Sequence, residues 1–240
     1  MTQDLPKLVL LPGLDGTGLF FARLEQALAG RVPVQTVSYP SDAVLGYSEL
    51  PEYVHAKIGD APAVLLGESF SGPVAIHLAA KLPDQIKGLI LAATFLNSPW
   101  PRWMIERAAR AKPSHVPRAW IDGVLRGGSD DPELGALIAK IMAGFDPSVR
   151  TARLSAVAQA DATQDFARVS CPILALHGRS DWLVWPGPIR RAIAAKPGAE
   201  MKLLAGPHML LQKNPHEAAD AIEAFVRNPL SPSFTGRGLG

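Results

Sequence analysis

Three residue types that together perform nucleophilic catalysis follow apolar runs of the chain. Ser69 lies in GESFSG, directly after APAVLL, whereas Asp181 follows PILALHGRS and His208 follows AEMKLLAGP. A serine hydroxyl is a weak nucleophile until a histidine accepts its proton, and a carboxylate must hold that histidine in the right tautomer. The three residues therefore indicate acyl transfer by a serine hydrolase, provided that the fold brings them together.

A glycine-rich stretch supplies a fourth element of this chemistry. LPGLDGTG, residues 11–18, follows the first apolar run, and its three glycines permit a sharp turn that presents backbone N–H groups. Such groups stabilise the negative oxygen that forms when a nucleophile attacks a carbonyl.

The stretch GESFSG departs from the usual nucleophile turn, G-x-S-x-G, at one position. Ser71 stands where that pattern has its second glycine. Serine is small and Gly72 follows it, so we expect the tight turn to form.

The elements that must position these residues are strands of one sheet. Short apolar runs alternate with segments of helical periodicity, which is typical of a parallel, doubly wound sheet covered on both faces. The carboxyl ends of parallel strands meet at one edge of the sheet, where ligands bind. The predicted strands cover residues 7–11, 32–39, 63–66, 86–94, 172–178 and 199–206.

The alternation stops between residues 97 and 168. This stretch contains several prolines, segments of helical periodicity and no clear strand, and it is longer than a crossover connection needs. We therefore predict a helical cap (lid) over 97–168, inserted into an α/β core made of 1–96 and 169–228. The tail, 229–240, is rich in Pro, Gly and Ser and is expected to be flexible.

Composition excludes several other classes of protein. The chain has 240 residues, of which 48% are hydrophobic and 19% charged, with a net charge of +2, so we expect a globular protein without a nucleic-acid partner. The single cysteine, Cys171, excludes an intramolecular disulfide and a Cys-rich zinc site, and we expect it to be a buried small side chain. The sequence shows neither a signal peptide nor an apolar stretch of about 18 residues. A cytoplasmic protein without a membrane span is expected.

On these residues the chain resembles the α/β-hydrolase superfamily, and within it the serine carboxylesterases, over all but the tail. The superfamily's order of nucleophile, acid and histidine is met by Ser69, Asp181 and His208. The resemblance implies an α/β fold with a mainly parallel six-stranded sheet flanked by helices and an inserted helical cap. It also implies that the N–H groups of Leu14 and Phe70 form the oxyanion hole, and that no metal or organic cofactor is required. Two features depart from the family: Pro12 replaces a common histidine, and the usual N-terminal hairpin is missing.

Other histidines and carboxylates fit these roles less well. His208 alone among the six histidines lies in a glycine-flanked loop after the final predicted strand, whereas His177 ends a strand and is assigned a structural, loop-ordering role. The rival position for the acid, in FLNSPW after the fourth strand, contains no carboxylate.

The predicted cap carries three of the five tryptophans, namely Trp100, Trp103 and Trp120. These rings either pack the cap onto the sheet or line a pocket for an acyl or alcohol group. Both interpretations stay open.

The cap is also locally basic. Residues 96–126 contain six basic and two acidic side chains, a balance of +4, which indicates either a solvated helix face or a docking surface for an acidic partner or an anionic substrate. With the compact core, this balance resembles the pimeloyl-carrier-protein methyl esterases, in which cap arginines engage an acidic acyl carrier protein. The basic residues are Arg102, Arg107, Arg110, Lys112, Arg118 and Arg126.

The expected activity is hydrolysis of a small-molecule carboxylic ester through an acyl-enzyme. An esterase or thioesterase acting on acyl groups linked to a carrier protein is the alternative, and lactone and carbon–carbon cleavage are neighbouring chemistries that the triad alone does not separate. A non-catalytic, ligand-binding protein on the same fold is the alternative from another class.

Overall fold

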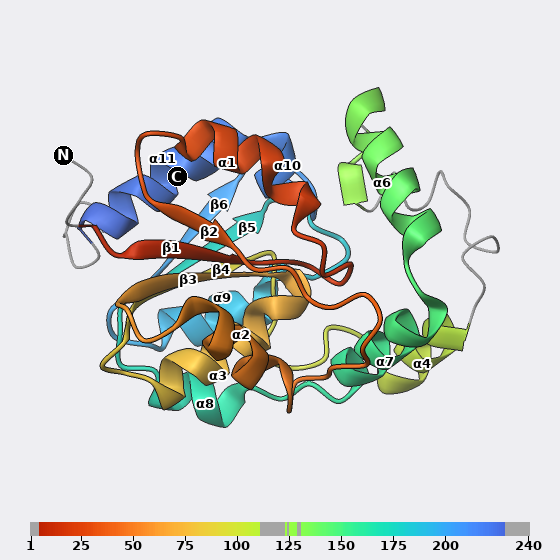
Figure 1. Cartoon of the computed structure of the whole chain (residues 1–240), viewed down its shortest axis with the longest axis horizontal. Helices are drawn as coiled ribbons and strands as arrows, with labels where there is room; N and C mark the ends of the chain where they lie inside the picture. The colour runs from red at the N-terminus through yellow and green to blue at the C-terminus, as the bar shows by residue number, and fades with distance from the viewer. Residues whose placement is uncertain (1–4, 111–122, 124, 129–130, 229–240) are drawn as a thin grey trace.

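Six parallel strands form a single sheet in the order β2-β1-β3-β4-β5-β6 (Figure 1). This computed structural model describes residues 5–110, 123, 125–128 and 131–228. The predicted six-stranded α/β sheet is confirmed, and each strand falls on a predicted apolar run. The strands are β1 Lys7–Leu11, β2 Val34–Thr36, β3 Ala63–Glu68, β4 Ile86–Ala92, β5 Ile173–Gly178 and β6 Ala199–Leu204.

Strand β2 is shorter than the run over 32–39 predicted. Val37 N still donates to Leu10 O of β1 at 3.0 Å, but Tyr39 N donates to Gly16 O at 2.7 Å, in the loop beyond β1. The residues after β2 therefore hold the loop that follows β1.

Helices cover both faces of the sheet because neighbouring strand residues point to opposite sides and are apolar on both. On β1, Leu8 and Leu10 belong to the core under α1 and α11, whereas Val9 and Leu11 belong to the core under α2 and α3. Figure 1 shows α1 and α11 above the sheet and α2, α3 and α8 below it. The bounds are α1 Ala22–Leu28, α2 Leu50–Ile58, α3 Gly72–Lys81, α8 Thr163–Arg168, α9 Pro186–Ala194, α10 Leu210–Lys213 and α11 Pro215–Arg227, with short 3₁₀ turns η1 Leu19–Phe21 and η2 Ser69–Ser71.

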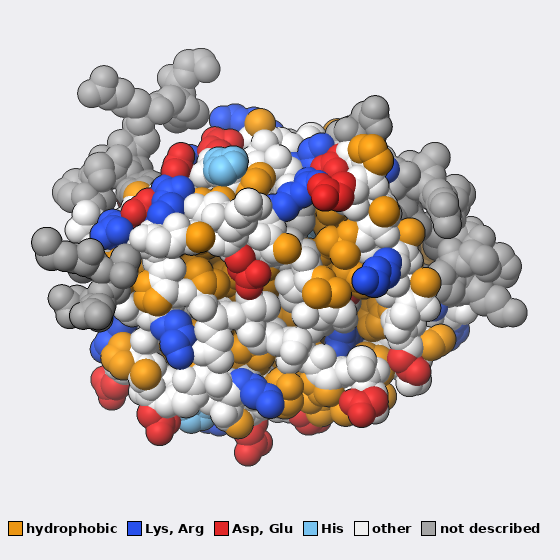
Figure 2. All heavy atoms as spheres, turned by 45° about the horizontal axis from the view of Figure 1, so that its top comes forward, with side chains coloured by type: hydrophobic (Ala, Val, Ile, Leu, Met, Phe, Trp, Pro, Cys, Tyr) orange, Lys and Arg blue, Asp and Glu red, His pale blue; other side chains and the backbone are white. Residues whose placement is uncertain are grey.

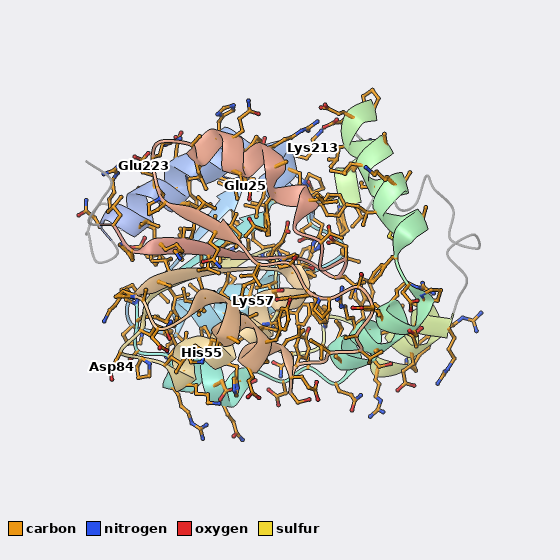
Figure 3. The ribbon with its side chains drawn as sticks, in the orientation of Figure 1. Glu25, His55, Lys57, Asp84, Lys213 and Glu223 are labelled. Atoms are coloured by element: carbon orange, nitrogen blue, oxygen red, sulfur yellow. The ribbon has the colours of Figure 1, made fainter. Side chains whose placement is uncertain are left out.

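Labelled side chains mark the same two layers. Figure 3 shows Glu223 on α11 on one side of the sheet, and His55 and Lys57 on α2 on the other. Cys171 is half-buried against the α2–α3 core, and this burial raises the pKa of its thiol to about 11, as suits a packing residue.

The segment between β4 and β5 contains α4 Arg102–Arg110, α6 Pro132–Gly144 and α7 Pro147–Ala158 ahead of α8. Helices α6 and α7 both begin at an Asp-Pro pair: Asp131 accepts from Leu134 N at 3.0 Å, and Asp146 accepts from Ser148 N at 2.7 Å. These three helices lie at the right-hand end of Figure 1, and α4 packs against α7. Helix α8 instead contacts the core, because its Asp165 Oδ2 lies 2.8 Å from Nδ1 of His77 on α3. The division into core and cap stays a prediction.

The direction in which successive strands are added to the sheet reverses between β1 and β3. In open α/β sheets, the carboxyl ends of such a pair border a crevice. The register pairs Leu11 with Gly67, so the loop after β1 lies beside the turn after β3. Further along the sheet, Gly178 pairs with Leu204, which brings the loop after β5 beside the loop after β6.

The surface carries mixed charge. Figure 2, which brings the top of Figure 1 forward, shows basic and acidic side chains interspersed. Arg31, for example, donates to Asp220 and to Glu223 at 2.6 Å each. In the described part of the chain, no helix combines the length and apolar character that crossing a membrane requires.

Candidate active site

A chain of two hydrogen bonds joins Ser69, His208 and Asp181. His208 Nε2 lies 3.0 Å from Ser69 Oγ, and His208 Nδ1 lies 2.9 Å from Asp181 Oδ2. Because a carboxylate can only accept, Nδ1 carries the proton and Nε2 is left to accept from the serine hydroxyl. The arrangement can therefore deprotonate Ser69 during an attack.

Ser69 occupies a strained turn between β3 and α3. Its φ of 49° lies in the left-handed region, which non-glycine residues seldom adopt. A Cβ at Gly67 would lie 2.6 Å from Ser71 O, so the strand end and the following turn touch too closely for a side chain there. The geometry is that of a nucleophile turn despite the missing second glycine.

Ser71 contributes a hydrogen-bonding hydroxyl in addition to being small. It is fully buried, donates from Oγ to Pro12 O, and lies 2.6 Å from Tyr39 Oη. Since its own proton goes to the Pro12 carbonyl, Tyr39 donates to Ser71. The position that departs from the motif thus connects the turn after β3 to the loop after β1.

Asp181 is buried and held in its charged form. Burial by itself raises the pKa of the carboxyl, but the charge of His208, hydrogen bonds from both His177 and His208, and the Val184 N–H lower the pKa well below its ordinary value. Its Oδ1 accepts from Leu183 N at 3.0 Å and from Val184 N at 2.9 Å. These bonds fix the carboxylate against rotation.

His177 has a closer relation to the site than its sequence context suggested. Its Nε2 lies 2.8 Å from Val184 O and 3.3 Å from Asp181 Oδ2, so it carries the proton and faces the same carboxylate oxygen as His208. Its Nδ1 has no hydrogen-bond partner within the described residues. The spacing of four residues between His177 and Asp181 was the available signal.

The two expected oxyanion donors lie beside Ser69. Leu14, Ser69 and Phe70 all line one cavity of about 270 Å³. Phe70 is in the first turn of η2, where backbone N–H groups lack intrahelical partners. Leu14 and Phe70 thus share a cavity with the hydroxyl, and their role as oxyanion donors stays a prediction.

The cavity above Ser69 is apolar. Among the described residues that line it, all but Ser69 have apolar side chains. Trp100 lines it, and its Nε1 donates to Leu183 O at 2.7 Å. Trp182, which sequence reasoning missed, also lines it, whereas Trp103 is 67% exposed and does not. Trp120 lies outside the described residues. The side chains that line the cavity from the segment between β4 and β5 and from the loop after β5 include Trp100, Met104, Ile105, Leu154, Val157 and Trp182.

The basic residues of α4 are exposed. Arg102 Nε donates to Glu106 Oε1 at 2.6 Å, and Arg107 and Arg110 also lie at the surface. Lys112 and Arg118 fall outside the described residues. In the part of the chain that the structure describes, no group of three or more His, Cys, Asp or Glu side chains is arranged to hold a metal ion.

The chain matches the model of a known protein family over most of its length. The family described as "Serine aminopeptidase, S33" matches residues 35–211, which include Ser69, Asp181 and His208. The chain belongs to this α/β-hydrolase family.

Relatives of this α/β-hydrolase include esterases. The pimeloyl-[acyl-carrier protein] methyl ester esterase of Xanthomonas oryzae pv. oryzae is 29% identical over 242 residues, covering 92% of this chain and 95% of the relative. The polyketide synthase ThaQ of Burkholderia thailandensis is 25% identical over 253 residues, covering 96% of this chain but only 12% of that protein. The enol-lactonase of Burkholderia xenovorans LB400 has a TM-score of 0.79 at 21% identity, with 95% of this chain and 92% of that chain covered. The α/β-hydrolase fold is therefore shared along nearly the whole length.

Proposed function

We propose that the protein is a serine esterase that cleaves carboxylic esters of apolar acyl groups through an acyl-enzyme. The observation that carries the proposal is the hydrogen-bonded series Ser69–His208–Asp181, whose Ser69 lines an apolar cavity. Esterase relatives of matching length support the same class of reaction.

The reaction follows from the donors and acceptors of the site. Ser69 Oγ attacks the ester carbonyl carbon while His208 Nε2 takes the hydroxyl proton, and Asp181 stabilises the resulting imidazolium. The carbonyl oxygen becomes negative and accepts from the N–H groups of Leu14 and Phe70. His208 then returns the proton to the departing alkoxide, which leaves Ser69 acylated. Water deprotonated by His208 cleaves the acyl-enzyme in the same way.

The cavity favours an uncharged acyl chain. Burying a carboxylate or an ammonium among apolar side chains without a partner is costly. The family is described as serine aminopeptidases, and an aminopeptidase must bind the charged amino terminus of a peptide. No acidic side chain is found among the described residues that line this cavity, so ester substrates fit it better.

We also propose that residues 97–168 act as a cap on a core of 1–96 and 169–228. Helix α4 supplies Met104 and helix α7 supplies Leu154 to the cavity that contains Ser69. Both helices therefore contribute to the choice of acyl group.

The first prediction concerns Ser69 and the cavity. With p-nitrophenyl acetate, butyrate, hexanoate and octanoate, kcat/KM should rise by about fourfold per methylene until the cavity is filled, since a buried CH₂ contributes about 0.8 kcal/mol. Ser69→Ala should lower kcat/KM by at least about 1,000-fold and abolish labelling by a fluorophosphonate. Ser48→Ala, at an exposed serine outside the cavity, is the matched control.

Two results would count against this proposal. Unchanged turnover in Ser69→Ala, together with failure of the native protein to label, would instead favour a ligand-binding protein on the same fold. Preference for an aminoacyl p-nitroanilide over every ester would favour a peptidase.

A second candidate function is hydrolysis of methyl esters whose acyl chain is attached to a carrier protein. It is favoured by the similarity to the Xanthomonas enzyme over 92% of this chain and by the exposed arginines of α4, the helix that supplies Met104 to the cavity. An acidic carrier protein would meet a positive surface next to Trp100 and Met104.

The second prediction tests this candidate by comparing a free methyl ester with the same ester linked to an acyl carrier protein. Arg102→Glu combined with Arg107→Glu should raise KM for the carrier-linked ester about 10-fold and leave KM for the free ester unchanged, because only the former uses the charged surface. Lys87→Glu, at the amino-terminal half of β4 and therefore away from the strand ends of the site, is the control. Equal kcat/KM for the two esters, insensitive to the double substitution, would exclude the carrier.

A further inference from the structure

The turn Gly13–Gly16 fixes the direction of the Leu14 N–H. Gly16 N donates to Gly13 O at 3.1 Å, which closes the turn. The Gly13 carbonyl and the Leu14 N–H belong to one planar trans peptide unit, so they point in opposite directions. Whatever holds Gly16 in place therefore also aims the Leu14 N–H.

Arg153 of α7 holds this turn from outside the core. Its Nη1 donates to Leu14 O at 2.9 Å, and its Nη2 donates to Pro40 O at 3.1 Å. The guanidinium carbon lies over the rings of both Tyr39 and Phe145, 5.6 Å from each centroid. Its position is fixed by two backbone carbonyls and two aromatic faces.

Gly16 packs directly against this guanidinium. A Cβ at Gly16 would lie 2.3 Å from Arg153 Nη1, and the φ of Gly16 is +75°. The Gly16 carbonyl accepts from Tyr39 N at 2.7 Å on another side. The turn is thereby enclosed by Arg153 and by the residues that follow β2.

Arg153 is costly to bury, which argues for a role beyond filling space. It is 1% exposed, and burial lowers its pKa below the ordinary value, offset in part by the charges of Tyr39 and Asp15. No carboxylate in the described part of the chain lies within ion-pair distance of it, and its Nε has no hydrogen-bond partner there. An apolar side chain would pack at lower cost, but it would offer no planar fork for two carbonyls.

We propose that Arg153 is a positioning residue for the oxyanion site, through which helix α7 of the inserted segment holds the turn that aims the Leu14 N–H. The inference rests on the esterase function proposed above, since an oxyanion site matters only for acyl transfer. Correct seating of the inserted helices then becomes a condition for transition-state stabilisation at the core.

The third prediction is that Arg153→Met lowers kcat about 10- to 100-fold with little change in KM, because loss of one oxyanion donor costs about 100- to 1,000-fold and here the donor is displaced, not removed. Affinity for a trifluoromethyl ketone that forms a tetrahedral adduct with Ser69 should fall in parallel with kcat/KM. Arg153→Lys should be intermediate, because an ammonium cannot bridge both carbonyls as a planar fork does. Added guanidinium ion should restore part of the activity of Arg153→Ala.

Controls separate the possible failures. Arg150→Met removes the same charge from the same helix at a residue that is not among those lining the cavity, and should keep wild-type kcat. Thermal unfolding of each variant checks that it is folded, and Arg153→Lys supplies the measurement if Arg153→Met is not. Ser69→Ala retaining activity would overturn the esterase function itself. With Ser69→Ala inactive, a folded Arg153→Met or Arg153→Lys with wild-type kcat, or with reduced kcat but unchanged affinity for the ketone, would overturn the role of Arg153 alone.

Discussion

At the scale of single residues, the buried carboxyl group of Glu68 is the least expected feature of the site. It directly precedes Ser69, is 7% exposed, and accepts from Gln212 Nε2 at 2.8 Å. Burial raises its pKa to about 7, with the charge of Asp15 adding to the shift and the Gln212 bond and His208 opposing it. The group therefore titrates near neutral pH, far above an ordinary glutamate.

This shift gives a fourth prediction, on stability. The folded protein binds a proton at Glu68 up to about pH 7, whereas the unfolded chain releases it near pH 4.5, so the free energy of unfolding falls as pH rises through that window. Glu68→Gln removes the cost of the buried charge and keeps an acceptor for Gln212. In urea unfolding, the variant should gain more stability over wild type at pH 8.5 than at pH 5.

Glu52→Gln, at an exposed position on α2, serves as the control. Its free energy of unfolding should differ from that of wild type by the same amount at pH 5 and at pH 8.5. A Glu68→Gln variant whose difference from wild type does not change with pH would contradict a raised carboxyl pKa.

At the scale of elements, one hydroxyl joins the loops that follow β1 and β3. Ser71, in the turn after β3, donates to Pro12 O in the loop after β1 and accepts from Tyr39 after β2. The turn that contains Ser69 and the turn that contains Leu14 are thus connected by hydrogen bonds where the strand order reverses. A second glycine at this position would leave both partners unpaired.

The fifth prediction follows from that connection. Ser71→Gly should lower the free energy of unfolding by about 1–3 kcal/mol, since it leaves the buried Tyr39 hydroxyl and Pro12 carbonyl unsatisfied. It should also lower kcat for p-nitrophenyl esters with KM unchanged, because the oxyanion turn loses an anchor. Tyr39→Phe, alone and combined with Ser71→Gly, shows how much of the lost unfolding free energy comes from the bond between Ser71 and Tyr39. Tyr53→Phe is the control. Wild-type stability and kcat in Ser71→Gly would mean that this serine matters only for being small.

The strands were predictable because all six are apolar runs bounded by turn residues, a local signal. The length of β2 was not, because it is set by the bond between Tyr39 and the loop after β1, a contact distant in sequence. Arg153 was missed for a related reason. It stands in the buried stripe Val149–Arg153–Val157 of α7, and a charged residue at helical spacing normally indicates a solvated face.

At the scale of the whole molecule, topology explains why the three polar residues of the candidate site were found from sequence. In a parallel sheet the carboxyl ends of all strands lie at one edge, so Ser69, Asp181 and His208 were expected at the same edge once the strands were assigned. The cavity was harder to predict. Whether Trp100, Trp103 or Trp182 lines it depends on how α4 and the loop after β5 meet, which no local pattern encodes. The catalytic roles of Ser69, Asp181 and His208, and the substrate contacts of the tryptophans, stay predictions that the assays above test.

The contact between Arg153 and Leu14 spans 139 residues, the same separation as that between His208 and Ser69. During synthesis from the amino terminus, Ser69 and the loop after β1 therefore emerge long before Arg153 and His208, which contact them. Under the proposed function, an incomplete chain contains the candidate nucleophile without its candidate base, so we expect it to resist acylation. Esterase turnover would then report that the last strand and helix have docked.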